Sequence, residues 1–357
     1  MYIEIDRMLL QENVALAPLT TFQLGGPARF FVEAKSRPDV EQAVAFARSK
    51  DLPLFVLGGG SNLVVSDSGW PGLVLKVAIG DIEQRSGEVE GRIPFDVGAG
   101  ESWDNFVSHA VGADCAGVEC LSGIPGSVGG TPVQNVGAYG QEVSETVESV
   151  QVFDRKDGQV RELCREACGF TYRSSIFNTT ERGRFIILRV IYALVPGGSP
   201  SLKYADLKQR FAGRETAPDL RETREAIRQI RARKGMLIIE GDPDCRSAGS
   251  FFKNPVLSEK QHEDLVSRAS DRGLTVPAYP ALESMKKVSA AWLVEHSGFG
   301  KGYESGHVGI SSKHALALVN RGGARSAEIL ALKDQIQRRV EEIWGVRLDP
   351  EPVMVGF

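Results

Sequence analysis

The chain has 357 residues, and its 42 lysines and arginines against 46 aspartates and glutamates give a formal net charge of −4. A chain of this length can bury a large core and is expected to form two or three domains. The weak charge gives no electrostatic reason to expect nucleic acid or a membrane surface as partner, so a small-molecule ligand is favoured. No apolar run approaches the roughly 20 residues of a membrane-spanning helix, and the amino terminus lacks a long hydrophobic core, so we expect a cytoplasmic protein.

The N-terminal part of the chain follows a strand, helix, strand pattern. Alternating apolar residues predict a strand over 28–34, and apolar residues at helical spacing predict an amphipathic helix over 38–50. A short apolar run predicts a buried strand over 54–57. These elements form a β-α-β unit that leads directly into a glycine-rich loop.

That loop reads Gly58-Gly59-Gly60-Ser61-Asn62. It fails the dinucleotide-binding fingerprint because Leu63 stands where the last glycine should be, and the chain has no Walker motif. Successive backbone amides in a glycine loop can still form an anion-binding concavity. A tight turn that needs flexible residues explains the loop equally well when it is taken alone.

A second glycine-rich loop covers residues 121–140, between a helical pattern around 103–110 and a predicted strand over 147–153. It reads LSGIPGSVGGTPVQNVGAYG, with six glycines, two prolines and almost no charge. Such a segment cannot form an α-helix, because glycine loses too much backbone entropy and an internal proline removes a donor and clashes with the preceding turn. The two loops together predict a cradle for a pyrophosphate-bearing cofactor.

Two helices and a terminal strand are predicted in the C-terminal half. Residues 219–234 form a charged helix in which Arg231 and Lys234 lie about one turn apart. Ser326 is expected to cap a further helix. Its core-facing residues follow at helical spacing and are Ile329, Leu332, Ile336, Val340 and Ile343. Apolar residues at 348 and 353–355 predict a strand that holds the C-terminal tail.

The five cysteines and five histidines form neither a CxxC pair nor a zinc-ligand array, so no metal site is predicted. Cys164 and Cys168 could share a helical face as half of a metal site. Reduced thiols in a cytosolic protein explain the same residues without a metal.

Several long motifs occur in one order along the chain. They are Pro18-Leu19-Thr20-Thr21-Phe22 with Gly25-Gly26, the 58–62 loop, the 123–140 loop, Tyr172-Arg173-Ser174-Ser175-Ile176-Phe177 and Ala248-Gly249-Ser250-Phe251-Phe252-Lys253-Asn254-Pro255. With these motifs the chain, from about residue 15 to its C-terminus, resembles the UDP-N-acetylenolpyruvoylglucosamine reductase (MurB) family, flavoenzymes of peptidoglycan synthesis. Tyr204-Ala205-Asp206-Leu207 resembles the tyrosine loop of the type I members.

The resemblance implies an α+β protein with a FAD-binding fold of the vanillyl-alcohol oxidase (PCMH) type. Two α/β subdomains would bind FAD, residues 1–75 and 76–230, with 346–357 returning to the FAD-binding region. An α+β substrate-binding domain would cover residues 235–345. This fold holds the pyrophosphate through loops other than GxGxxG, which explains the failed fingerprint. FAD is implied to bind noncovalently, in agreement with the lack of His and Cys in both glycine loops.

The resemblance also implies the ligand contacts. The implied FAD contacts lie in and beside the two glycine loops, with the half from Gln134 to Tyr139 facing the flavin ring and the substrate. They are Leu57, Gly58, Gly59, Gly60, Ser61, Asn62, Ser122, Gly123, Pro125, Gly126, Gly129, Gly130, Gln134, Asn135, Gly137, Ala138 and Tyr139. The implied substrate contacts are Tyr172, Tyr204, Lys234, Asn254 and His314.

The implied reaction reduces UDP-N-acetylglucosamine enolpyruvate to UDP-N-acetylmuramate, with NADPH as co-substrate and FAD as the relay of hydride to C3. Ser250 is implied to protonate C2, while Arg173 and Glu351 stabilise the carboxylate and the developing enolate. The planar fork of arginine suits a carboxylate. The implied partners are the UDP-sugar and NADPH, without nucleic acid or membrane, and the protein is expected as a monomer or weak oligomer.

Three features depart from the family pattern. Pro352 follows Glu351 where relatives commonly continue Glu-Val, and proline restricts the residue before it, so Asp349 is a rival for the carboxylate role. His314 stands where the family usually has Asn or Gln. Extra residues lie between 234 and 248, which could move Lys234 relative to the serine motif.

Two other functions fit part of the pattern. One is another oxidoreductase of the same superfamily, acting on a different sugar or alcohol. The other is a noncatalytic sensor that binds a UDP-sugar or flavin. The Ser250 and Glu351 motifs argue against the first, and the joint presence of Arg173, Ser250 and a C-terminal carboxylate argues against the second.

Overall fold

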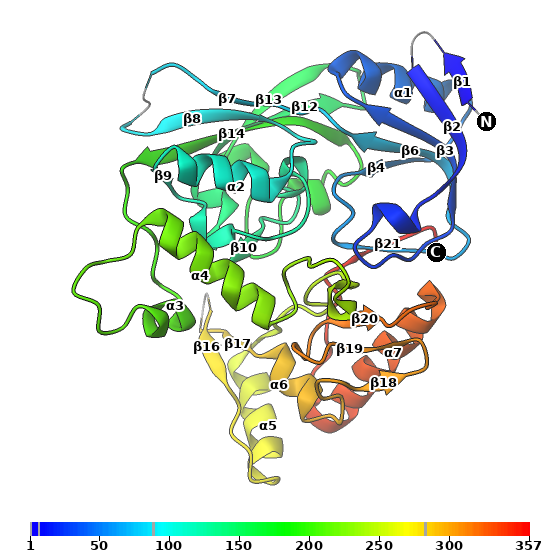
Figure 1. Ribbon diagram of the computed structural model, residues 1–357. Coiled ribbons are helices and arrows are strands. Elements are labelled where there is room, and N and C mark those ends of the chain that lie inside the picture. Colours follow the sequence, from blue (N-terminus) through cyan, green and yellow to red (C-terminus); the bar gives the residue numbers. More distant parts are fainter. Residues whose placement is uncertain (1, 6–7, 88–89, 282–283) are drawn as a thin grey trace. The chain divides into compact units, whose positions relative to one another are not determined.

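The structure is a computed structural model that describes residues 2–5, 8–87, 90–281 and 284–357 (Figure 1). The chain divides into two compact units. Unit 1 comprises Met1–Val14, Ala28–Gly60 and Trp70–Arg233, and unit 2 comprises Ala15–Pro27, Ser61–Gly69 and Lys234–Phe357. The division into three domains that the sequence suggests stays a prediction.

Unit 1 begins with a five-stranded sheet in the order β1-β2-β3-β6-β4. Its strands are β1 (Tyr2–Ile5), β2 (Met8–Ala15), β3 (Pro27–Ala34), β4 (Leu54–Leu57) and β6 (Trp70–Val77). The strands β3, β6 and β4 are parallel, so helix α1 (Arg37–Ser49) makes the crossover from β3 to β4. The strands predicted at 28–34 and 54–57 and the helix at 38–50 are therefore confirmed, although only the last residue of β4, Leu57, is fully buried.

Helix α1 begins at a capping box formed by Ser36 and Asp39. The Ser36 side chain accepts a hydrogen bond from the Asp39 amide (3.4 Å), and the Asp39 carboxylate accepts one from the Ser36 amide (2.9 Å). This reciprocal pair satisfies amides that the first helical turn leaves open. Val40, Ala43 and Val44 on the buried face then pack into the core of unit 1.

A second sheet in unit 1 has the order β13-β12-β14-β8-β7, with β9 paired to the end of β14. Its strands are antiparallel and are β7 (Ile82–Gln84), β8 (Ile93–Gly98), β9 (Cys115–Ala116), β12 (Val147–Asp154), β13 (Val160–Cys164) and β14 (Phe185–Pro196). The accompanying helices are α2 (Trp103–Gly112), α3 (Ala205–Arg210) and α4 (Leu220–Arg233). The rings of Trp103 and Phe106 on α2 pack against buried Tyr192 on β14 and join helix to sheet.

The described residues of unit 2 form three α-helices and three small sheets. The helices are α5 (Glu259–Ser270), α6 (Ala290–Glu295) and α7 (Ser326–Trp344). The strands are β15 (Val256–Leu257), β16 (Ala278–Pro280), β17 (Lys286–Val288), β18 (Glu304–Ser305), β19 (Val308–Ile310), β20 (Leu318–Asn320), β5 (Leu63–Val65) and β21 (Val353–Val355). Strand β21 pairs with β5 in parallel, which confirms a strand at 353–355.

The prediction that Ser326 caps α7 is wrong by one residue. Arg325 is the N-cap, and Ser326 is the first helical residue, whose buried hydroxyl donates to the Val65 carbonyl. The open amides of this end are bound by Asp67, whose carboxylate accepts from the amides of Ser326 (2.8 Å) and Ala327 (3.2 Å). The predicted core face is confirmed except at Ile343, which is only partly buried.

No helix in the described ranges is both long and apolar enough to cross a membrane. Within the same ranges, no group of three or more histidine, cysteine, aspartate or glutamate side chains could hold a metal ion. Each of the five cysteines is a free thiol, and only Cys164 is exposed.

Candidate active site

The two glycine loops of unit 1 pack against each other, backbone to backbone. A Cβ added to Gly59 would lie 2.5 Å from the Gly126 Cα and 2.7 Å from the Ser127 amide nitrogen. One added to Gly58 would lie 2.8 Å from the Ser127 hydroxyl oxygen. Real Cβ atoms do not approach other atoms so closely, so only glycine permits this contact. The two loops from which the sequence predicts a cradle are thus in direct contact.

Ser127 places an unused hydroxyl in this cradle. The residue is 7% exposed, and its Oγ has no hydrogen-bond partner among the described residues. A buried hydroxyl without a partner costs free energy, because it has lost its bonds to water. A phosphate oxygen is the acceptor that such a donor, set among glycine backbone, would suit.

The start of the second loop is held by charged groups on two helices. Asp104 on α2 accepts the Gly123 amide (2.6 Å) and pairs with Arg224 (2.6 Å) and Arg228 (2.6 Å) of α4. Arg231, also on α4 and 8% exposed, donates to the Gly123 carbonyl (3.0 Å). Both backbone groups of Gly123 are thus fixed by buried or half-buried side chains.

These surroundings shift the pKa of the Asp104 carboxyl and of the Arg231 guanidinium. Burial alone would raise the pKa of the Asp104 carboxyl, but the hydrogen bonds from Arg224 and Gly123 outweigh it and lower the pKa below its usual value. Burial lowers the pKa of the Arg231 guanidinium, opposed by its hydrogen bond with Tyr139. Asp104 is therefore ionised at neutral pH.

The second half of the loop contains residues in the left-handed backbone conformation. Asn135 (φ +46°) and Tyr139 (φ +52°) flank the short hairpin strand β10 (Gly137–Ala138), which pairs with β11 (Gln141–Glu142). The Asn135 side chain is buried and donates to Glu142 (2.8 Å) and to the Thr171 carbonyl (3.0 Å). Its side chain therefore holds the loop in shape, and its role as an FAD contact stays a prediction.

Arg173 lies against this hairpin. It occupies the tip of a tight turn closed by the reciprocal backbone bonds of Thr171 and Ser174, with φ of +54°. Its guanidinium donates to the Gly137 carbonyl (2.7 Å) and lies 5.5 Å from the Tyr172 ring centre. The structure thus brings together Arg173, Tyr172 and the loop half that was predicted to face the flavin ring.

Tyr204 also reaches this loop. The rings of Tyr139 and Tyr204 meet edge to face, with 5.1 Å between their centres and an interplanar angle of 88°. Tyr204 is the N-cap residue of α3 and follows the irregular segment after β14. A predicted cofactor contact and a predicted substrate contact are therefore neighbours in unit 1.

Other predicted residues divide between units. Leu57 and Ser122 are buried, and the Ser122 hydroxyl donates to the Glu119 carbonyl (2.6 Å). Their roles as FAD contacts stay predictions. Ser61 and Asn62 belong to unit 2, where the Asn62 side chain donates to the Glu351 carbonyl (3.3 Å).

Unit 2 places Ser250 beside Glu351. The segment after Gly249 pairs with the C-terminal tail through an antiparallel bridge between Phe252 and Pro350. The Glu351 amide donates to the Phe251 carbonyl (2.9 Å), so Glu351 lies opposite the residue that follows Ser250. Two predicted catalytic residues from distant parts of the sequence thus lie on backbone segments that pair with each other.

The structure bears on the rivalry between the two tail acids. Asp349 is exposed, whereas Glu351 is half-buried. Pro352 lies just before β21, and the Val353 amide after it donates to the Asn62 carbonyl (2.9 Å). The missing N–H of Pro352 therefore falls outside strand β21, and the tail stays tied down.

Asn254 and His314 have structural contacts in unit 2. The Asn254 side-chain oxygen accepts the Ala290 amide (2.9 Å) at the start of α6. The His314 ring nitrogen Nδ1 accepts the Leu316 amide (3.1 Å), and the Leu316 carbonyl accepts the Phe251 amide (2.8 Å). His314 thus supports the segment that carries Ser250, and the substrate roles of His314, Asn254 and Lys234 stay predictions.

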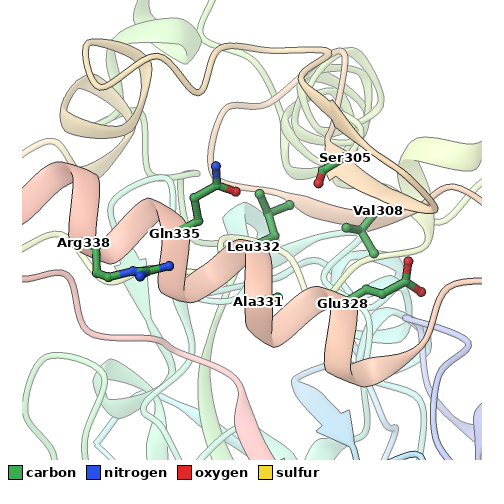
Figure 2. Close-up of a pocket in the computed structure, with 7 residues that line it drawn as sticks. All are labelled: Ser305, Val308, Glu328, Ala331, Leu332, Gln335 and Arg338. Atoms are coloured by element: carbon green, nitrogen blue, oxygen red, sulfur yellow. The ribbon is translucent and has the colours of Figure 1, made fainter.

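A separate hollow of about 370 Å³ lies along α7 and the β18-β19 hairpin (Figure 2). Its lining residues are Ser305, Val308, Glu328, Ala331, Leu332, Gln335 and Arg338. None of them is a predicted site residue, so this hollow is distinct from the candidate active site.

The chain is similar to known proteins in sequence and in fold. Residues 28–163 match the family model described as "FAD binding domain", and residues 242–355 match "UDP-N-acetylenolpyruvoylglucosamine reductase, C-terminal domain". The UDP-N-acetylenolpyruvoylglucosamine reductase of Thermobifida fusca (strain YX) is 44% identical over 96% of this chain and 97% of its own. That of Streptomyces coelicolor is 45% identical over 96% and 90%. The crystal structure of the Thermus caldophilus enzyme (MurB) is 29% identical, with a TM-score of 0.64 over 98% and 99% of the two chains.

The FAD-binding match and the mixed α/β layers confirm the predicted class, a flavoprotein fold of the vanillyl-alcohol oxidase type. By its identity to relatives along nearly the whole chain, the protein belongs to the UDP-N-acetylenolpyruvoylglucosamine reductase family of flavin oxidoreductases.

Sequence reasoning missed three residues of the site. Ser127 could have been found, because a hydroxyl at the centre of a glycine loop is itself a signal. Asp104 and Glu119 gave no such signal, since Arg224, which pairs with Asp104, and Ser201, which donates to Glu119, lie far away in the sequence.

We expect Gly59→Ala to abolish flavin retention. Its methyl group would meet the Gly126 backbone at 2.5 Å, which forces the two loops apart. The flavin-to-protein absorbance ratio of the purified protein should fall at least about tenfold, because parting the loops costs more than the roughly 1.4 kcal/mol of a tenfold change. Gly112→Ala is the matched control, since a Cβ there meets nothing within 4 Å. Full flavin content in Gly59→Ala would refute the cradle.

We expect Asp104→Asn to destabilise unit 1 by about 2 kcal/mol, because charge-assisted bonds to Arg224, Arg228 and Gly123 are lost. The lowered pKa of Asp104 makes its contribution complete above the unfolded-state pKa of about 3.9 and lost as the pH falls through the folded-state pKa. The gap in urea midpoint between wild type and variant should therefore stay constant at neutral pH and close in acid.

Asp157→Asn, which removes an exposed ion pair with Arg161, is the control and should change the midpoint much less. Equal effects of the two substitutions would contradict the anchoring role of Asp104.

Proposed function

We propose that the chain catalyses the NADPH-dependent, FAD-mediated reduction of UDP-N-acetylglucosamine enolpyruvate to UDP-N-acetylmuramate, a step of peptidoglycan precursor synthesis in the cytoplasm. Relatives that are 40–45% identical over 96–97% of the chain carry the name of that reductase. The observation that carries the proposal is the Phe252–Pro350 bridge, because it pairs the backbone segment that carries Ser250 with the segment that carries Glu351.

Noncovalent FAD suits the glycine loops of unit 1. The Ser127 hydroxyl lacks a partner among the described residues, and the backbone of Gly58 and Gly130 lies beside it. Neither loop contains the His or Cys that a covalent link would use. When bound, FAD would carry hydride from NADPH to C3 of the enolpyruvyl group.

Ser250 would supply the proton to C2. A serine hydroxyl is a weak acid, so it works only toward a strongly basic carbon such as an enolate. Gly249, at φ +73°, turns the backbone just before it, and buried Phe251 anchors the backbone just after it. Such anchoring keeps the hydroxyl at a fixed position relative to its own strand.

Arg173 and Glu351 would stabilise charge during the reaction. Gly137 holds the Arg173 guanidinium through one of its five N–H groups, and this bond fixes the direction of the fork. A fixed fork suits the carboxylate of an enolpyruvyl group, because no reorganisation is needed when charge develops. Glu351 would assist from the tail segment that also bonds to Asn62.

The sugar nucleotide would be bound by side chains that include Tyr172 and Tyr204. Tyr204 is held against Tyr139, so its ring has a defined place. Lys234, Asn254 and His314 are the further proposed contacts. We propose no nucleic acid or membrane partner and a monomer or weak oligomer.

The decisive experiment is anaerobic. NADPH should bleach the yellow holoenzyme, and UDP-N-acetylglucosamine enolpyruvate should then restore the colour. An oxidoreductase for another substrate would bleach without recolouring, and a sensor would do neither.

Ser250→Ala should bleach with NADPH at the wild-type rate but recolour at least about 100-fold more slowly, because only the second half-reaction needs the proton. Stopped-flow absorbance of the flavin measures both steps. Ser267→Ala, an exposed serine on α5, is the control. Fast recolouring of Ser250→Ala would remove Ser250 from the mechanism.

Replacing each of the two tail acids by its amide distinguishes their roles. Glu351→Gln should lose about 100-fold or more in kcat while it retains FAD, and Asp349→Asn should keep kcat near wild type. Steady-state turnover with flavin content measured on the same samples decides. The reverse pattern would assign the role to Asp349.

A further inference from the structure

Glu119 is a fully buried carboxylate held by uncharged donors. It is 0% exposed, and it accepts hydrogen bonds from the amides of Gly117 (2.8 Å) and Ser201 (2.8 Å) and from the Gln141 side chain (2.8 Å). Within the described ranges, no lysine, arginine or histidine forms an ion pair with it. The Cys120 thiol contacts the same carboxylate at 3.9 Å. A buried charge is costly unless it is hydrogen-bonded, so these donors stabilise Glu119 where it lies.

These bonds tie together three segments that are far apart in the sequence. Gly117 lies just before the second glycine loop, and Gln141 follows directly after it. Gln141 also accepts the Cys120 amide (2.8 Å), which closes the base of the loop. Ser201 belongs to the irregular segment between β14 and α3, three residues before Tyr204.

Both backbone groups of Ser201 are fixed by this cluster. Its amide donates to Glu119, and its carbonyl accepts from the Cys120 thiol (3.1 Å). Burial raises the pKa of the Cys120 thiol well above its usual value, aided by the charge of Glu119. The thiol therefore stays protonated and keeps its donor.

We propose that Glu119 is a positioning residue that holds the Tyr204 segment, residues 197–204, in register with the end of the glycine loop. The Tyr139–Tyr204 ring contact lies at the point where these two segments meet. The effect of Glu119 on substrate affinity follows through Tyr204, and that last step rests on the proposed function.

The two segments depend on Glu119 to different degrees. The glycine loop has other anchors, including Asp104 at Gly123 and the Trp103 indole on the Leu121 carbonyl (3.0 Å). The Tyr204 segment is bound at its start by the Gly197 amide on the Asp114 carbonyl (2.8 Å) and at Ser201 by the Cys120 thiol, and Glu119 supplies the acceptor for the Ser201 amide, three residues before Tyr204. Loss of the carboxylate should therefore loosen the Tyr204 segment and leave the loop in place.

Glu119→Gln tests this with little change in shape. One oxygen of Glu119 accepts the Ser201 amide, the Gln141 side chain and, at 3.9 Å, the Cys120 thiol, and the other oxygen accepts the Gly117 amide. An amide puts a donor on one of these positions, where it opposes another N–H. The Ser201 contact should weaken, and local opening should become about tenfold more frequent.

Limited trypsinolysis of the holoenzyme measures that opening at the Lys203–Tyr204 bond, with the exposed Lys301–Gly302 bond as internal reference. Cleavage at Lys203 should rise about tenfold in Glu119→Gln. The matched control is Asp154→Asn, which alters another fully buried carboxylate, paired with Arg184 at the last residue of β12. The control should leave the cleavage ratio unchanged.

A second variant keeps the test open if Glu119→Gln does not fold. Cys120→Ala removes the thiol bond to the Ser201 carbonyl and the longer thiol contact with the Glu119 carboxylate (3.9 Å), while Glu119 keeps its bond from the Ser201 amide, and cleavage should rise about threefold. An unchanged cleavage ratio in both variants, or an equal rise in Asp154→Asn, would overturn the proposal. This readout needs no substrate, so it stands even if the proposed reaction is wrong.

Kinetics then test the link to the substrate. Glu119→Gln should raise the KM for the UDP-sugar about fivefold or more while kcat stays within about twofold, as expected when uniform binding is lost. In a double-mutant cycle with Tyr204→Phe, the two effects on KM should be non-additive. Additive effects on KM would show that Glu119 does not act through Tyr204.

Discussion

A loop made largely of glycine has too few side chains to fix its own shape, and the candidate site depends on how this problem is solved. Unit 1 solves it with two acids outside the loop core. Asp104 binds the Gly123 amide, and Glu119 binds the segments before and after the loop. The glycine backbone is then free to approach the other loop at Gly59 and to surround the Ser127 hydroxyl.

Unit 2 solves a different problem, which is to give a chain terminus a fixed position. Strand β21 pairs with β5, and the preceding residues pair with the segment after Ser250. The tail is thus bonded to segments that precede it by about a hundred and nearly three hundred residues. The two pairings hold the backbone of Glu351 in place, which the role proposed for this residue requires.

Local patterns in the sequence predicted what depends on local structure. The β-α-β unit, both glycine loops and the core face of α7 were found from periodicity and composition. The resemblance supplied Arg173, Ser250 and Glu351, for which the residues alone gave no decisive sign. What no local pattern predicts is a partner far along the chain, such as β5 for β21 or Asp104 for Arg224. The buried polar clusters, and the assignment of residues 15–27 and 61–69 to unit 2, depend on such partners.

Backbone strain gives an independent reason to place chemistry at the hairpin end of the loop. Asn135, Tyr139 and Arg173 all have φ near +50°, a conformation that L-residues adopt at a cost of about 1–3 kcal/mol. Glycine would avoid that cost, so the contacts made by these side chains are expected to offset it. Asn135 does so through bonds that shape the loop, whereas Tyr139 contacts Tyr204 and Arg173 holds Gly137. Three residues in the left-handed conformation thus lie at the hairpin end of the loop, which is the part of unit 1 where the cofactor and substrate contacts are proposed.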